Sequence, residues 1–229
     1  MATVEIEVAG AVRTVLLNRP EKRNALDAEM LEALTAAFRR PPVASERLAV
    51  IRANGPAFCA GLDLRARKEM TGGASSIEET LHTIENYPLP VVAVVQGDAI
   101  AGGNELALHC DIVVASSRAN FGMSLAQIGL APTWFLTKKL IEVAGPVATR
   151  KILLLGDPLP ATRMHELGII AECVPPAELE SKATAVIDRL AANAPLSLKA
   201  MKAVIVREMK FGDGVAHADV DERVMQASR

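Results

Sequence analysis

The sequence predicts an α/β fold, and two observations carry that prediction. Short segments rich in apolar and β-branched residues recur along the first half of the chain, with amphipathic helical segments between them. This alternation is typical of parallel strands joined by crossover helices. The second half has mostly helical periodicity, so we expect a helical C-terminal part after the α/β core.

The N-terminal elements follow from local patterns. The segments "TVEIEV" and "AVRTVLL" are separated by Ala9-Gly10, which indicates a β-hairpin. Asp27 is a good N-cap for the helix predicted over "DAEMLEALTAAF", and Pro41-Pro42 ends that helix. Three buried strands are predicted where apolar residues run almost without interruption, in "RLAVIRA", "PVVAVV" and "DIVVAS".

The remaining segments are mainly loops and helices. Residues 66–76, "ARKEMTGGASS", are polar and rich in glycine and serine, which favours a mobile loop. Residues 77–87 are predicted to form a helix that Pro88 and Pro90 end. Further helices are predicted over residues 146–156, 160–168, 178–193 and 195–209, with a short strand over 169–174.

Composition and charge exclude several classes of function. The chain has 229 residues, of which 50% are hydrophobic, enough for one sizeable core. Its formal net charge of -2 provides no overall basic field for nucleic acid or an anionic membrane surface. The longest apolar run, residues 90–95, is too short to span a bilayer, and the N-terminus lacks a targeting pattern. We therefore expect a cytoplasmic protein without nucleic-acid or membrane partners.

The three cysteines indicate a reducing compartment and no metal site. Cys59, Cys110 and Cys173 have no CxxC spacing, and their odd number leaves one without a partner. We expect neither a disulfide framework nor a zinc site.

Two similar loops follow two of the predicted buried strands: "NGPAFCAGLDL" (residues 54–64) and "QGDAIAGGNEL" (residues 96–106). Each passes through small residues, so backbone amides near Leu62 and Gly102 could lack acceptors within the chain. Two such amides that converge can hold an oxyanion. The alternative is that the glycines only mark tight turns. Neither loop fits a phosphate-binding motif, and no nucleophile elbow or metalloprotease motif occurs in the chain.

A family resemblance rests on five motifs that occur in order. They are "VLLNRPEKRNALDAEM", "AFCAGLDL", "GDAIAGGNELALHCDIVVAS", "FGMSLAQIGLAP" and "LLLGDPLPATRMHELGII". Together they resemble the enoyl-CoA hydratase/isomerase, or crotonase, family from about Val12 to Gly212. The resemblance implies a spiral of ββα units over residues 1–190 and a C-terminal helical trimerisation region, apparently shortened, over 191–229. It also implies a homotrimer or hexamer that binds acyl-CoA thioesters.

The resemblance assigns roles to five positions. The amides of Leu62 and Gly102 would form the oxyanion hole for the thioester oxygen. The carbonyl of Ala60 would meet the adenine amino group of CoA. Arg23 and Arg65 lie where basic residues of the family often approach the CoA phosphates. Coenzyme A is part of the substrate, so no separate cofactor is expected.

Glu105 falls at the position of the first catalytic glutamate of the hydratases. Its alternative role is structural, because an acidic residue in the first turn of a helix complements the helix dipole. The resemblance favours an acid/base role, and an apolar pocket would raise the pKa of Glu105 towards a useful range.

The second catalytic glutamate of the hydratases is replaced by Leu125. Downstream, bulky Thr133, Trp134 and Phe135 stand where the family has small residues. Hydration needs one group to deprotonate water and another to protonate the α-carbon, whereas isomerisation needs a single proton carrier. Glu105 alone is not a clean isomerase signature either, because family isomerases place their base at the position of Leu125.

The predicted function is an acyl-CoA-processing enzyme of the hydratase/isomerase type, with a single glutamate acid/base. Two alternatives remain: a non-catalytic acyl-CoA binding protein on the same fold, and a crotonase-type hydrolase or decarboxylase. Four nearby side chains could substitute for the missing glutamate, although structural roles are favoured for them: Asp98, His109, Asp111 and Gln127.

Overall fold

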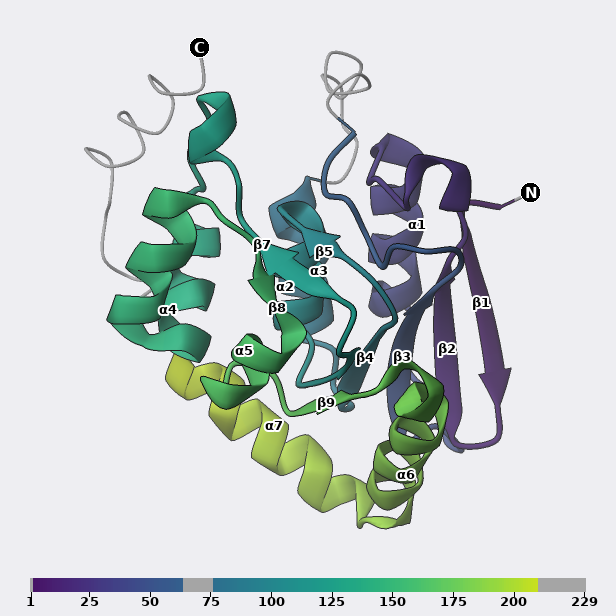
Figure 1. The fold of residues 1–229 in the computed structure, drawn as a ribbon. Coiled ribbons are helices and arrows are strands. Elements are labelled where there is room, and N and C mark those ends of the chain that lie inside the picture. Colours follow the sequence, from purple (N-terminus) through teal and green to yellow (C-terminus); the bar gives the residue numbers. More distant parts are fainter. Residues whose placement is uncertain (1, 64–75, 210–229) are drawn as a thin grey trace.

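The computed structural model describes residues 2–63 and 76–209, and its main feature is a six-stranded sheet (Figure 1). The strands lie in the order β1-β2-β3-β4-β6-β9, and only the β1–β2 pair is antiparallel. Their bounds are β1 Val4–Ala9, β2 Val12–Leu17, β3 Leu48–Ala53, β4 Val91–Val95, β6 Ile112–Ser116 and β9 Glu172–Val174. The predicted hairpin and the predicted parallel pairing are both confirmed.

Helices cover both faces of this sheet. Alternate residues of the central strands point to opposite faces. Ala49 and Ile51 belong to one buried apolar cluster, with α1 (Ala28–Arg39), α2 (Ile77–Glu85) and α3 (Gly102–Leu108). Leu48 and Val50 belong to the other, which α6 (Leu179–Ala192) closes. Burial on both faces explains why these strands are almost continuously apolar.

A smaller three-stranded sheet extends from the main one and supports the second glycine loop. It consists of β5 (Ala99–Ile100), β7 (Asn120–Gly122) and β8 (Leu159–Pro160), in that order. The Ala101 amide donates to the Gly122 carbonyl at 2.7 Å, which fixes the start of α3 against β7.

Helix α4 (Trp134–Arg150) is the largest departure from the predicted elements. The sequence places a helix start at Pro146, whereas the structure has helix from Trp134 onwards. The break falls at Gly145, whose φ of 68° is non-helical, and helical structure continues through a π-helical turn at Lys151–Leu155. Proline lacks the amide that a continuous helix requires, which explains why the kink falls beside Pro146. The predicted helices near residues 160 and 178 are confirmed as α5 (Ala161–Glu166) and α6.

Helix α7 (Pro195–Met209) extends from α6 towards α4 in Figure 1. Its buried Lys202 donates to Asp111 Oδ2 at 2.6 Å and to the Leu89 carbonyl at 3.0 Å. This contact attaches α7 to the loops at the amino ends of β4 and β6. Within the described ranges, none of the helices is both long and apolar enough to cross a membrane.

A buried ion pair stabilises the junction between the hairpin and α1. Arg13 Nε lies 2.9 Å from Glu46 Oε2, and both side chains are almost completely buried. Tyr87 also donates to Glu46. The guanidinium donates further to the carbonyls of Ala37, Arg40 and Pro41. Burial would raise the pKa of Glu46, but the hydrogen bonds from Arg13 and the Val43 amide hold it below its ordinary value.

We expect Arg13→Met to lower the free energy of unfolding by about 3–5 kcal/mol, because it leaves the Glu46 carboxylate buried without a cation. Urea denaturation measures this. Arg39→Met is the matched control: Arg39 pairs with Glu79 on the surface, where a salt bridge contributes about 0–1 kcal/mol. Similar losses in the two variants would contradict a special role for the buried pair.

Candidate active site

The two glycine loops lie side by side beyond the carboxyl ends of β3 and β4. An isolated parallel bridge joins Cys59 to Ala99. The Phe58 amide donates to the Asp98 carbonyl at 3.0 Å, and the Ile100 amide donates to the Cys59 carbonyl at 2.9 Å. The carboxyl ends of adjacent parallel strands are a common position for ligand sites.

Glycine allows this close approach. A Cβ on Gly103 would lie 2.0 Å from the Cys59 carbonyl oxygen, so no side chain fits there. Gly61 has a φ of +91°, and a Cβ on it would lie 2.9 Å from the Ile100 carbonyl oxygen. The paired loops therefore require glycine at both positions.

The amides of Leu62 and Gly102 lie next to each other at this junction. Leu62 forms a parallel bridge with Leu26, in which the hydrogen bonds of Leu26 are with Gly61 and Asp63. The Leu62 amide therefore points to the opposite side of the strand. Gly102 is the first residue of α3, where amides have no acceptor within the helix. A Cβ on Gly102 would lie 3.4 Å from Leu62 N. Within the described residues, no backbone carbonyl accepts from either amide, so together they could hold an oxyanion.

A cavity of about 460 Å³ opens against these amides. Its volume falls in the usual range for a small-molecule site. Most of its wall is apolar, and the described residues that line it come from both loops, from the start of α2 and from the segment that leads into α4. They are Ala60, Leu62, Ile77, Glu78, Ile100, Ala101, Gly102, Met123, Ser124, Leu125, Ile128, Leu130, Ala131, Pro132, Thr133 and Leu136.

Glu105 lies one helical turn after Gly102, behind the wall of this cavity. Its side chain has no exposed surface, and it is absent from the residues described as lining the cavity. Burial raises the pKa of Glu105 to about 8, against smaller lowering effects of Asn104 and Lys139. Asn104 Nδ2 donates weakly to Oε1 at 3.4 Å, while Oε2 has no hydrogen-bond partner among the described residues. Burial therefore favours the protonated form of this carboxyl group near neutral pH.

His109 is the nearest ionisable neighbour of Glu105. Its Nδ1 lies 3.7 Å from Glu105 Oε2 and donates to the Glu105 backbone carbonyl at 2.8 Å. Its ring stacks on Phe135, with centroids 5.1 Å apart. Burial lowers the pKa of His109 to about 3, so the ring is neutral and the approach to Glu105 is not an ion pair.

A buried ion-pair network joins α2 to α4 in this region. Lys139 of α4 pairs with Glu85 at 2.5 Å and with Glu142 at 3.1 Å. Burial would raise the pKa of Glu85, but the Lys139 ammonium outweighs it and lowers the pKa below its ordinary value. This network was not predicted, because its members come from α2 and from the part of α4 that was not predicted to be helical.

The other residues expected at the CoA site have mixed outcomes. Ala60 lines the cavity, and its amide donates to the Arg23 carbonyl at 3.0 Å, so these two positions are neighbours. Arg23 itself is exposed. Arg65, with residues 66–75 of the predicted loop, lies outside the described residues. Leu125 lines the cavity, so the position of the second family glutamate faces the expected substrate volume.

The four possible substitutes for that glutamate lie elsewhere. Asp98 accepts from the amide and the side chain of Asn120. Asp111 accepts from Val91 N and Lys202. Gln127 donates to the Leu155 carbonyl and to Asp157. His109 is buried behind Glu105. The cavity lining contains none of the four among its described residues.

Glu78 lines the cavity but was not predicted as a site residue. It lies in the first turn of α2, and Thr133 Oγ1 donates to its Oε1. Among the described residues that line the cavity, Glu78 is the one with a titratable side chain. No local pattern singles out Glu78, because paired acidic residues at a helix start are adequately explained by the helix dipole.

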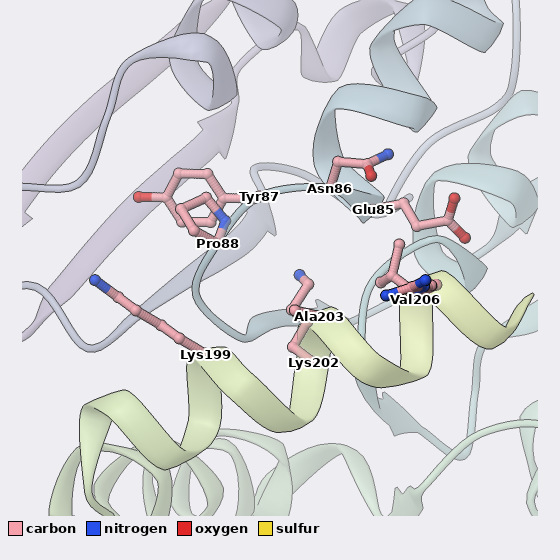
Figure 2. A pocket seen from close by; sticks show the side chains of 9 residues that line it. Glu85, Asn86, Tyr87, Pro88, Lys199, Lys202, Ala203 and Val206 are labelled. Carbon is pink, nitrogen blue, oxygen red and sulfur yellow. The ribbon is translucent and has the colours of Figure 1, made fainter. Parts of the chain in front are cut away.

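A second cavity, of about 500 Å³, lies between α7 and the segment that follows α2. Figure 2 shows Tyr87 and Pro88 facing Lys199 and Ala203 of α7 across it. Its lining contains neither glycine loop among the described residues, so it is separate from the paired amides.

The fold and the paired loops define a class of protein: an α/β protein with two backbone amides at an apolar cavity beside a buried glutamate. A family model described as enoyl-CoA hydratase/isomerase matches residues 7–228. The chain belongs to this family, as the five motifs indicated.

The chain is also similar to individual members of this family. The chain is 32% identical over 214 residues to the short-chain-enoyl-CoA hydratase of Clostridium acetobutylicum, covering 90% of this chain and 82% of the relative. It is 33% identical over 220 residues to an enoyl-CoA hydratase of Mycobacterium tuberculosis, covering 88% and 81%. An enoyl-CoA hydratase/carnithine racemase structure from Magnetospirillum magneticum superposes with a TM-score of 0.86 at 30% identity, covering 97% and 86%. The predicted crotonase-like fold is thus confirmed.

Proposed function

We propose that this enzyme binds an enoyl-CoA thioester and stabilises its enolate form with the amides of Leu62 and Gly102. Glu105 carries the proton that the α-carbon gains or loses. Coenzyme A enters as part of the substrate, and the chemistry requires no further cofactor. Ala60, Arg23 and Arg65 are proposed as contacts of the CoA portion.

The observation that carries this proposal is the pair of amides on the wall of an apolar cavity. When the α-proton leaves or a nucleophile adds to the β-carbon, negative charge develops on the thioester oxygen. Two fixed amides in a mostly apolar cavity stabilise that charge more than they stabilise the neutral carbonyl. The names of the relatives, which are enoyl-CoA hydratases, support the same substrate class.

Glu105 suits the role of proton carrier because of its position and its protonation state. It follows Gly102 by three residues in α3, so the two residues lie on the same face of the helix. With a pKa of about 8, the group can both donate and accept a proton near neutral pH. Contact with substrate requires the Glu105 side chain to turn towards the cavity, as catalytic hydrogen bonds often form fully only in the complex.

We also propose that the enzyme is a cytoplasmic homotrimer or hexamer, with residues 191–229 as the trimerisation region. Among the described side chains of helix α7, four large apolar ones are exposed, which supports an interface there: Leu196, Met201, Val204 and Ile205. Light scattering after size-exclusion chromatography measures the assembly state directly, and a monomer at micromolar concentration would contradict it.

The function is tested by incubating the enzyme with a 2-enoyl-CoA and, separately, with a 3-enoyl-CoA, followed by mass spectrometry of the products. A gain of one water from the first substrate indicates hydration, and conversion of the second to the conjugated isomer indicates isomerisation. Tight binding without any product would favour the non-catalytic acyl-CoA binding protein. Release of free CoA or of carbon dioxide would favour a hydrolase or a decarboxylase.

A further inference from the structure

The active-site cavity contains a carboxylate at a position with no role in the proposed function. Glu78 lines the cavity from the first turn of α2. The preceding residue, Ile77, also lines the cavity and lies next to Gly102. Leu62 and Gly102 line the same cavity. A carboxylate therefore lines the same, mostly apolar cavity as the residues that carry the paired amides.

Thr133 holds this carboxylate in place. Its Oγ1 donates to Glu78 Oε1, which joins the start of α2 to the start of α4. Thr133 is the N-cap residue of α4, yet its side chain makes no capping hydrogen bond. The hydroxyl is therefore committed to Glu78 and not to the helix.

The adjacent glutamate has a different environment. Glu79 forms an exposed ion pair with Arg39 of α1 and is absent from the described lining of the cavity. The placement of Glu78 is thus specific to one of two adjacent carboxylates. This difference also provides a matched control.

The position of Leu125 explains why a second carboxylate matters. Addition of water across a carbon–carbon double bond requires one group to accept a proton from water and another to protonate the α-carbon. Glu105 can supply only one of these, and Leu125 leaves the usual second position apolar. Glu78 lines the same cavity as Leu125, and its carboxylate accepts a hydrogen bond from Thr133.

We propose that Glu78 is the second catalytic carboxylate of this enzyme, that Thr133 positions it, and that the reaction is therefore hydration of a 2-enoyl-CoA. This rests on the proposed function. Water oxygen bonds to the β-carbon and its proton passes to the Glu78 carboxylate. The π-electron pair moves towards the thioester oxygen, and as it returns the α-carbon takes the proton of Glu105. Proton transfer through solvent from Glu78 to Glu105 restores both groups, and the sum is the addition of one water.

The test separates the two proton transfers. Hydration of crotonyl-CoA uses both carboxylates, whereas exchange of the α-hydrogens of butyryl-CoA for deuterium in heavy water uses only Glu105 and the two amides. We expect Glu78→Gln to lower kcat for hydration by about 10²-fold or more, the lower end of the usual contribution of a general acid or base. Deuterium exchange, butyryl-CoA binding and Tm should stay close to those of the wild type.

Two further variants complete the design. Thr133→Val removes the hydroxyl without removing a helix cap, so it should reduce hydration less than Glu78→Gln does, and Thr133→Ser should restore it. Glu79→Gln should retain wild-type hydration, exchange and binding.

The outcomes are distinct. Hydration by Glu78→Gln at the wild-type rate overturns the role of Glu78, and so does a parallel loss of hydration, exchange and binding, which indicates a structural role. A wild-type enzyme that isomerises a 3-enoyl-CoA but adds no water overturns this inference and leaves the proposed function standing. A wild-type enzyme with neither turnover nor exchange overturns both.

Discussion

Glu105→Gln should lower kcat for enoyl-CoA turnover by about 10²–10⁴-fold, the usual contribution of a positioned acid or base. The substitution keeps the size of the side chain and removes its transferable proton. Both hydration of crotonyl-CoA and deuterium exchange of butyryl-CoA should be lost, which distinguishes Glu105 from Glu78. Wild-type exchange, which needs the carboxylate, should rise with pH through about 8, the pKa that burial gives Glu105.

Glu105→Gln should lower activity but raise the thermal stability of the protein at high pH. The folded-state pKa of Glu105, about 8, is above the ordinary value of 4.5, so folding favours the protonated form. Its contribution to stability is complete below pH 4.5 and is lost as the pH rises through about 8. At pH 9, Glu105→Gln should therefore have a higher Tm than the wild type. Equal Tm values at pH 9, or undiminished turnover, would contradict the assignment of a buried proton carrier.

Gly102→Ala should lower kcat/KM by about 10²–10³-fold, comparable to the loss of one oxyanion-hole donor. The added methyl group would lie 3.4 Å from Leu62 N, in the space that a thioester oxygen must enter to reach both amides. The fold should persist, because the closest contact, 2.7 Å, is with Cδ1 at the flexible end of Ile77. Steady-state kinetics and thermal unfolding measure the two effects.

Ile77→Val provides the control for Gly102→Ala, since it removes Cδ1. The double variant relieves the contact with Ile77 but leaves the methyl group beside Leu62 N. Activity should stay low in the double variant. Recovery of the wild-type rate would show that crowding at Ile77, and not obstruction of the amides, caused the loss.

Many elements were predictable from the sequence because their signals are local. Asp27 caps α1 as expected, with its Oδ1 accepting from the Met30 amide at 3.0 Å. The continuous apolar runs of β3 and β4 marked strands buried on both faces. Helix α4 was missed before Pro146, because Gly145-Pro146 is a strong local break signal and only packing carries the helical structure across it.

The candidate site also has features that local patterns predict and features that depend on packing. Leu62 and Gly102 could be singled out because glycine loops after buried strands, together with the family motifs, specify backbone geometry. Glu105 could be placed on a helix with His109 one turn later, but its complete burial and the proximity of Lys139 depend on how α3 packs against α4.

The sequence by itself therefore determined the α/β class, the family and the two amides at the loop junction, since each rests on short-range patterns of residue type. Only the tertiary structure decided which carboxylates meet the cavity. Glu78 and Thr133 are 55 residues apart in the chain, and their hydrogen bond exists because α2 and α4 pack side by side at the cavity wall. No local pattern encodes that contact, because the free energy that fixes it comes from the packing of whole elements.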